Sequence, residues 1–261
     1  MGQIVEPKVF LIAETKIDEI GLQALLDHLG VPDWKSDAPS DVEKLIEVAG
    51  RSCYRSWDIK LNPNLTRIRK HNKDYIDNII AKGDGSVLEH GVVTFFFANI
   101  SRVLTSELCR HRVGVAISEA SLRFIRLTDL DWYAPIAIRE NEGAMEIFAK
   151  TFEELSEVQR QLADMLELDS GLSFDVKKKL TSAMRRVAPL GLATSMTWST
   201  NFRNLRHVIE MRTAPWAEEE IRKLFSMVGI IAQEKWPNIF GDYTTEIVDG
   251  IPWFKTNHPK V

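Results

Sequence analysis

The side chains best suited to chemistry gather in one short stretch of this 261-residue chain. Between positions 107 and 123 it carries Glu107, Arg110, His111, Arg112, Glu119, Ser121 and Arg123. Most of their neighbours are apolar, and charges at this density are costly to bury unless an anionic group pairs with the cations. Arginine guanidinium groups match phosphate and carboxylate oxygens through paired hydrogen bonds. The stretch therefore predicts an anion site, with phosphate as the first candidate. A structural network of ion pairs, Glu107 with Arg110 and Glu119 with Arg123, is the alternative.

A second group of polar residues recurs in the expected helix 201–212. On a helical wheel Arg212 lies close to Asn201 and on the same stripe as Leu205 and Val208, so it needs an anionic or carbonyl partner. A separate polar flank holds Arg203 and His207. This helix is a candidate ligand site, and a buried salt bridge between Arg212 and Glu89 is the alternative.

Three further candidates stand at the ends of expected elements. Arg185 lies in the last turn of a helix, where the helix dipole favours a cation in any case. His90 precedes an expected strand, where loops often carry ligand groups, although a lone histidine there is more often structural. Cys109 could serve as a nucleophile beside two arginines, but its half-apolar surroundings favour a small core residue.

Composition excludes several classes of protein. The net charge of −4 argues against a basic nucleic-acid binder. Two cysteines provide neither a disulfide framework nor a metal quartet, and no zinc-protease, phosphate-loop or dinucleotide-binding motif occurs. No secretion signal or membrane-spanning apolar run is visible. We expect a cytoplasmic protein that binds neither nucleic acid nor membrane.

The elements that must position these residues follow from hydrophobic periodicity. Strands are expected at 9–13, 92–100 and 192–198, with 121–127 as a strand or extended segment. Helices are expected at 41–49, 73–81, 101–112, 146–166, 176–187, 201–212 and 217–235, with Ser40 and Ser101 as N-caps and an irregular tail from Asn238. No linker or repeat interrupts the chain. The pattern predicts one α/β (α+β) domain over residues 1–261, with a central mixed sheet of few strands flanked by helices.

Three blocks of the chain, in order, resemble the flavin-dependent thymidylate synthase family. Arg110-His111-Arg112, eight residues and Ser121-Leu122-Arg123 are similar to the family signature Arg-His-Arg-x(7 or more)-Ser-x-Arg. Glu89-His90 before the strand at 92–100 is similar to the family's Glu-His strand entry. The block 201–212 resembles the family's C-terminal Asn-x-Arg-x-x-x-(Asn/His)-x-x-x-Leu-Arg pattern, and Arg185 precedes Pro189 as an arginine does in the family. The resemblance covers residues 86–225.

This resemblance implies conversion of dUMP to dTMP. The carbon donor would be 5,10-methylenetetrahydrofolate, and FAD would carry hydride from NADPH. Because C5 of uracil must attack the donated carbon, negative charge accumulates on the pyrimidine, and an arginine aimed at the ring carbonyls stabilises that charge. The reaction requires no cysteine nucleophile, in agreement with the core position expected for Cys109.

The resemblance also assigns roles to individual residues. Arg212 is implied as the catalytic residue. The residues implied for dUMP are Glu107, Arg110, Glu119, Ser121, Arg123, Arg185 and Arg212. Those implied for FAD are His90, Arg110, His111, Arg112, Glu119, Asn201, Arg203 and His207. No metal is implied.

Three features depart from the family pattern. Glu107 stands where the family often has Gln, on the ribose side of dUMP. Phe124 stands where Tyr is common, which removes one hydroxyl. The spacer between Arg112 and Ser121 has eight residues rather than seven. None of these changes removes a residue that the implied mechanism requires.

The resemblance implies a homotetramer whose active sites are shared between subunits, so that Arg185 and Arg212 need no partner within one chain. A rival hypothesis from a different class is a non-catalytic nucleotide- or RNA-binding module that uses the arginine-rich stretch. It predicts nucleic-acid binding that depends strongly on salt. A third hypothesis is a structural domain whose arginines form internal ion pairs.

Overall fold

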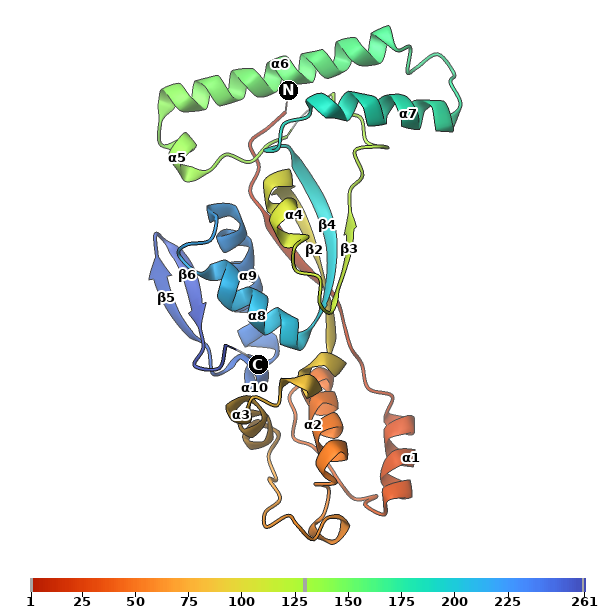
Figure 1. The fold of residues 1–261 in the computed structure, drawn as a ribbon, viewed down its shortest axis with the longest axis vertical. Coiled ribbons are helices and arrows are strands. Elements are labelled where there is room, and N and C mark those ends of the chain that lie inside the picture. Colours follow the sequence, from red (N-terminus) through yellow and green to blue (C-terminus); the bar gives the residue numbers. More distant parts are fainter. Residues whose placement is uncertain (1, 129–130, 260) are drawn as a thin grey trace. The chain divides into compact units, whose positions relative to one another are not determined.

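The chain forms a mixed α/β structure, shown in Figure 1 as a computed structural model that describes residues 2–128, 131–259 and 261. Four strands form one sheet in the order β1-β2-β4-β3. They are β1 (Lys8–Glu14), β2 (Val92–Ser101), β3 (Val115–Glu119) and β4 (Ala193–Asn201). The α/β class and the small number of strands predicted from the sequence are confirmed. No helix in the described part of the chain is long and apolar enough to cross a membrane.

The chain divides into two compact units, and each of the four strands has residues in both. Unit 1 comprises Met1–Phe10, Phe96–His111 and Ile117–Trp198. Unit 2 comprises Leu11–Phe95, Arg112–Ala116 and Ser199–Val261. The chain therefore passes repeatedly from one unit to the other, and the single domain expected over residues 1–261 stays a prediction.

Unit 1 contains four α-helices among its described residues. They are α4 (Arg102–Leu108), α5 (Ile136–Arg139), α6 (Glu142–Met165) and α7 (Phe174–Met184), and a 3₁₀ turn, η3 (Arg185–Val187), follows α7. The core of this unit includes Trp132 stacked on Phe152, with ring centroids 4.8 Å apart. The predicted helices at 146–166 and 176–187 are confirmed, although the second ends as a 3₁₀ turn.

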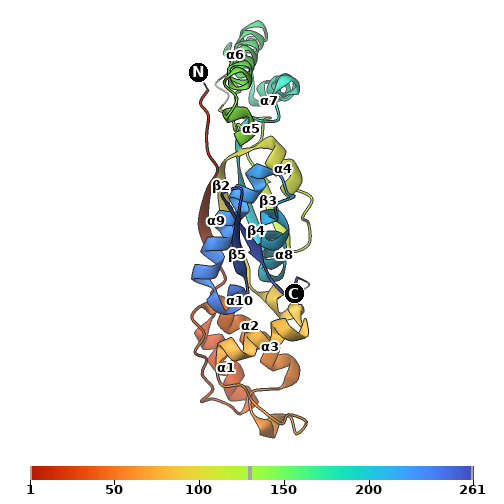
Figure 2. The same cartoon turned by 90° about the vertical axis from the view of Figure 1, so that its left-hand side faces the viewer.

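Unit 2 holds the remaining helices and a hairpin. Its elements are α1 (Glu19–Leu29), α2 (Asp41–Tyr54), η1 (Ile59–Leu61), α3 (Asn72–Lys82), η2 (Gly85–His90), α8 (Phe202–Thr213), α9 (Glu219–Lys235), α10 (Pro237–Phe240), β5 (Thr244–Val248) and β6 (Ile251–Lys255). Figure 2 shows α2 and α3 side by side. Ser40 caps α2 by accepting the Glu43 N–H (3.2 Å), as predicted.

Two predictions about irregular segments are wrong. The tail from Asn238 is largely ordered into α10 and the antiparallel β5–β6 hairpin. Asp249 and Gly250 form its two-residue turn, both at positive φ, as such hairpin turns require. Residues 121–127 were predicted as a strand or extended segment, but residues 122–124 form a turn and residue 125 a bend, and the strand that precedes them is β3.

The predicted helix 101–112 is too long. Ser101 caps α4 as expected, accepting the Leu104 N–H at 3.2 Å, but α4 ends at Leu108. The N–H groups of Arg110 and His111 donate to carbonyls only three residues back, which tightens the chain into a turn. The Arg110-His111-Arg112 motif therefore lies beyond the helix, so His111 does not share the apolar face of α4.

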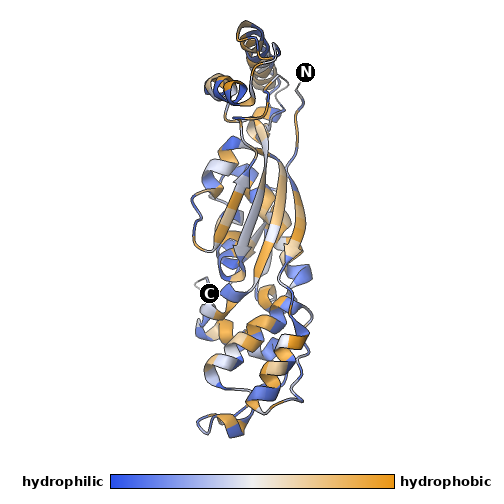
Figure 3. Cartoon of the chain, turned by 90° about the vertical axis from the view of Figure 1, so that its right-hand side faces the viewer, coloured by the Kyte–Doolittle hydropathy of each residue, from blue (hydrophilic) through white to orange (hydrophobic). Residues whose placement is uncertain are grey.

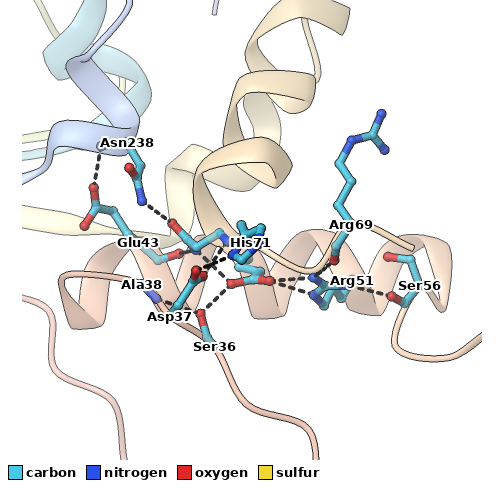
Figure 4. Close-up of polar contacts among 11 residues, drawn as sticks. Ser36, Asp37, Ala38, Glu43, Arg51, Ser56, Arg69, His71 and Asn238 are labelled. Atoms are coloured by element: carbon cyan, nitrogen blue, oxygen red, sulfur yellow. Dashed lines mark hydrogen bonds and ion pairs between the residues drawn. The ribbon is translucent and has the colours of Figure 1, made fainter. Parts of the chain in front are cut away.

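A network of buried charges fixes α2 within unit 2 (Figure 4). Glu47 accepts two hydrogen bonds from Arg51, at 2.9 and 2.6 Å, and both side chains are almost fully buried. Glu47 also accepts from Ser36 and from Asn72, at 2.5 and 2.8 Å. The Arg51 guanidinium lies 4.7 Å from the ring centroid of Tyr75. Because Glu47 binds Ser36, Arg51 and Asn72 together, this network ties α2 to α3 and to the segment before α2.

Candidate functional site

The arginine-rich stretch runs through both units and is less buried than its composition predicts. Arg110, Arg112 and Arg123 are exposed, and Glu107, His111, Glu119 and Ser121 are half-buried. The anion-site prediction assumed that these charges are buried and therefore need an anionic partner. The three arginines are exposed, so their charges carry no such burial cost. Their guanidinium groups face solvent, where an anionic ligand can reach them.

Ser121 and Arg123 lie on a turn of unit 1. The Ser121 carbonyl accepts the Phe124 N–H at 3.0 Å, and Ser121 Oγ accepts the Arg123 N–H at 3.3 Å. Such a turn presents the two side chains from neighbouring positions. Glu119, just before the turn, forms an ion pair with Arg102 (3.1 Å) and not the pair with Arg123 that the alternative of a structural network required.

A cationic hollow of about 450 Å³ in unit 1 adjoins Arg123. Its lining residues are Arg123, Asp175, Lys178, Lys179 and Ser182. Three cations face one carboxylate there, so the hollow is positively charged. Only Arg123 of this set could be predicted from the sequence, because Lys178 and Lys179 lie on α7 and come close to the turn only in the folded chain.

Phe124 holds two of these cations in place. Its ring stacks on Phe174, with centroids 5.8 Å and planes 14° apart. The Arg123 guanidinium carbon lies 5.9 Å from the Phe124 centroid, and Lys178 Nζ lies 5.2 Å from it. Both distances are within the range of cation–π attraction. The residue that departs from the family's usual Tyr thus contributes an aromatic face that positions the cations.

A cavity of about 410 Å³ in unit 2 brings together three of the predicted FAD residues. It is lined by Glu89, Val113, Asn201, Arg203, Asn204, His207, Pro259 and Val261. Its volume falls within the range of about 300–1,000 Å³ that small-molecule sites occupy. Glu89 pairs with Arg203 at 2.6 Å, so the partner suggested for Arg212 belongs to a different arginine.

The start of α8 is fixed against the loop that follows Arg112. Asn201 caps α8 by accepting the Asn204 N–H at 2.8 Å, and its own N–H donates to the Gly114 carbonyl at 3.1 Å. Gly114 has a φ of +68°, and an added Cβ would lie only 2.1 Å from Asn201 Nδ2. Glycine is therefore required there. This contact brings Val113 to the same cavity as Arg203 and His207.

The helical wheel for α8 identified the wrong buried arginine. Arg212 is half-buried, whereas Arg206 is fully buried. Arg206 donates to both carboxylate oxygens of Asp242, at 2.7 and 2.8 Å. Arg206 shares an i, i+3, i+7 spacing with Ile209 and Thr213, both buried, and this spacing could have identified it.

The other predicted residues have these positions. Glu107, His111 and Arg185 are half-buried in unit 1, and His90 is exposed at the end of η2 in unit 2. Unit 1 holds Glu107, Arg110, Glu119, Ser121, Arg123 and Arg185, which are all the predicted dUMP residues except Arg212. Unit 2 holds Arg212 and the FAD residues His90, Arg112, Asn201, Arg203 and His207. Each set is thus largely confined to one unit.

Comparison with known proteins agrees with the resemblance. Residues 36–238 match the family described as Thymidylate synthase complementing protein. A protein of Mycobacteroides abscessus named flavin-dependent thymidylate synthase is 33% identical over 248 residues, which are 93% of this chain and 92% of that protein. Proteins of the same name from Mycolicibacterium gilvum and Corynebacterium diphtheriae are 32% and 33% identical, covering 96% and 83% of this chain and 95% and 85% of their own lengths. The chain therefore belongs to the flavin-dependent thymidylate synthase family and is an enzyme of that family.

Proposed function

We propose that this enzyme converts dUMP to dTMP, with 5,10-methylenetetrahydrofolate as the carbon donor, FAD as the cofactor and NADPH as the reductant. One observation carries this proposal beyond family membership. Asn201, Arg203 and His207, expected from the sequence to bind FAD, line a single cavity of unit 2. Membership of an enzyme family argues against the rival hypothesis of a non-catalytic nucleotide- or RNA-binding module.

The residues around this cavity fit a flavin nucleotide. Asn201, Arg203 and His207 provide hydrogen-bonding groups, and Val113, Pro259 and Val261 provide apolar surface. A flat heteroaromatic ring needs both, because its edges are polar and its faces are apolar. Arg112, exposed in the adjoining loop, and His90, at the end of η2, would complete the site within unit 2. The other residues proposed for FAD, which are Arg110, His111 and Glu119, belong to unit 1.

The cationic hollow of unit 1 fits the phosphate of dUMP. Arg123 would bind the phosphate together with Ser121, and Lys178 and Lys179 would add positive charge. The remaining residues proposed for dUMP are Glu107, Arg110, Glu119, Arg185 and Arg212.

Arg212 would provide the chemical contribution of the protein. Its guanidinium would donate hydrogen bonds to the pyrimidine carbonyl oxygens and stabilise the negative charge that develops as C5 attacks the donated carbon. Bound flavin supplies the hydride that completes the methyl group. Arg185 would assist at the pyrimidine, and no cysteine takes part.

The protein is proposed to act as a homotetramer with active sites shared between subunits. Exposed aromatic and aliphatic side chains on the strands support an interface: in unit 1 Phe10 is 48% exposed and lies 6.4 Å from the ring of Phe96, and in unit 2 Ile12 is 56% exposed. In Figure 3 some of the strands are in the hydrophobic colour, and others are white or blue-grey. Exposed apolar patches of this kind are typical of interaction surfaces. The cytoplasmic location expected from the sequence stays a prediction.

Absorbance and turnover test the proposal together. The purified protein should be yellow, the released cofactor should chromatograph as FAD, and dTMP should form only when dUMP, methylenetetrahydrofolate and NADPH are all present. A colourless protein that takes up no added FAD would refute the proposal, as would dTMP formation without flavin.

A further inference from the structure

A C-terminal segment, residues 256–259 and 261, returns to the cavity that carries Asn201, Arg203 and His207. Pro259 and Val261 are lining residues of that cavity. The segment lies beyond residues 36–238, the part of the chain that matches the family. In Figures 1 and 2 the C-terminus lies next to α8.

Val261 is held firmly at this place. Its side chain is buried, and its carbonyl oxygen accepts a hydrogen bond from Arg206 Nε at 3.3 Å. Gly85, at the start of η2, approaches it so closely that an added Cβ would lie 3.3 Å from Val261 Cα. Val261 is therefore packed between α8 and η2, the two elements that contribute Arg203 and Glu89 to the cavity.

The other end of the segment is anchored to the ion pair between Arg206 and Asp242. Thr256 Oγ1 donates to Asp242 at 2.5 Å and accepts the His258 N–H at 3.0 Å. Asp242 in turn binds the fully buried Arg206. Burial alone raises the pKa of Asp242, but its hydrogen bonds with Arg206 and Thr256 lower that pKa below its ordinary value, so the carboxylate stays ionised. Arg206 thus ties both ends of the segment to α8.

We propose that Pro259 and Val261 form the apolar wall against which a planar ring of the bound FAD packs, so that the C-terminal segment retains the cofactor. The inference rests on the proposed function, because it takes FAD as the occupant of the cavity. It assigns positioning roles to two residues on one side, while Asn201, Arg203 and His207 provide the polar contacts.

Pro259 offers a direct test because it lines the cavity and is exposed to solvent. Pro259→Glu places a charged carboxylate on the apolar wall. Asn257→Glu is the matched control, since Asn257 is exposed in the same segment but does not line the cavity. The Kd for FAD is measured by quenching of flavin fluorescence, and unfolding of each apo-protein is followed by circular dichroism. A deletion of residues 259–261 provides a second variant.

Pro259→Glu and the deletion are expected to weaken FAD binding at least about tenfold, a factor that corresponds to about 1.4 kcal/mol. Asn257→Glu should bind FAD as the wild type does. Titration with ADP and with FMN identifies which ring packs on the wall, because each carries one of the two rings. If the wild type binds FAD and Pro259→Glu binds it equally well, this inference fails while the proposed function stands. A wild type that binds no FAD overturns both.

Discussion

Burial separates two kinds of arginine within α8. Arg206 is fully buried, binds Asp242 with both guanidinium nitrogens, and lies 4.8 Å from the ring centroid of Tyr243. Arg203 and Arg212 are only half-buried. A buried arginine whose donors are directed at the protein serves the fold, whereas the side chain of a half-buried arginine is partly open to solvent, where a ligand can contact it. This difference supports Arg212 as the residue for chemistry.

Replacement of Arg212 by alanine is expected to separate cofactor binding from turnover. FAD binding should be retained, because Arg212 is assigned to the pyrimidine rather than to the flavin. The rate of dTMP formation should fall by about 10²–10³-fold, the usual cost of removing one preorganised donor to a developing negative charge. Flavin absorbance of the purified variant and a turnover assay measure the two effects. Loss of flavin with turnover intact would contradict the assignment.

The phosphate assignment predicts a defect in dUMP binding at the cationic hollow. Arg123→Ala and Lys178→Ala should each raise the Kd for dUMP by about 10–100-fold, since a hydrogen bond to a charged group contributes about 1.5–3 kcal/mol. Lys177→Ala is the control, because Lys177 precedes Lys178 on α7 but does not line the hollow. Isothermal titration with dUMP gives the affinities.

Thermal unfolding distinguishes this site from a structural ion-pair network. If Arg123→Ala lowered the melting temperature and left dUMP binding unchanged, the third hypothesis of internal ion pairs would be favoured.

The position of Arg123 in the site could be predicted from the sequence, because Arg123 belongs to the Ser-x-Arg motif. The positions of Lys178 and Lys179 could not be predicted, because their meeting with Arg123 depends on the packing of α7 and not on local spacing.

At the scale of single elements, the sequence predicts best what local chemistry determines. Ser40 and Ser101 were identified as caps because a cap is a contact between residues three positions apart. The β5–β6 hairpin was missed although its Asp249-Gly250 turn is a strong local signal. The early end of α4 was also missed: after Leu108 the N–H groups of Arg110 and His111 donate to carbonyls three residues back, which tightens the chain into a turn.

The buried network of α2 contains a carboxylate, that of Glu43, with no ion pair to a cation among the described residues. Glu43 accepts hydrogen bonds from Ser40 Oγ at 2.6 Å and from the Asn238 N–H at 2.8 Å, and it is fully buried. Burial raises the pKa of Glu43 above its ordinary value, although its hydrogen bonds oppose the shift. A folded-state pKa above the unfolded one means that the folded state binds more protons. Stability is therefore lost as pH rises from the unfolded pKa through the folded one.

Glu43→Gln is expected to remove this loss. Because the amide keeps an acceptor for the Asn238 N–H and carries no charge, the variant should gain stability relative to the wild type as pH rises, by on the order of 1 kcal/mol. Urea unfolding at pH 4 and at pH 8 measures the change. Glu234→Gln, at an exposed glutamate of α9, is the control. A stability difference that does not vary with pH would show that Glu43 does not titrate between these values.

At the scale of the whole molecule, the division into two units is the feature that could not be predicted from the sequence. Segments 96–111 and 117–198 belong to unit 1, and the five residues between them belong to unit 2. No shift in composition marks these points, because each falls inside a strand or next to a turn. The family resemblance predicted which residues matter, but not that the dUMP residues other than Arg212 would lie in unit 1 and most of the FAD residues in unit 2.

The proposed homotetramer gives the last prediction, which concerns the exposed strands. Phe10→Arg should convert the tetramer to smaller species, because it replaces apolar burial of about 1.5–3 kcal/mol per copy by a charge that lacks a partner. Ile20→Arg is the control, since Ile20 is 85% exposed on α1 and carries the same change. Sedimentation velocity gives the mass of each variant, and dTMP formation is measured on the same samples. Because the active sites are proposed to be shared between subunits, turnover should fall with the tetramer fraction. A monomeric Phe10→Arg protein with undiminished turnover would show that each chain carries a complete site.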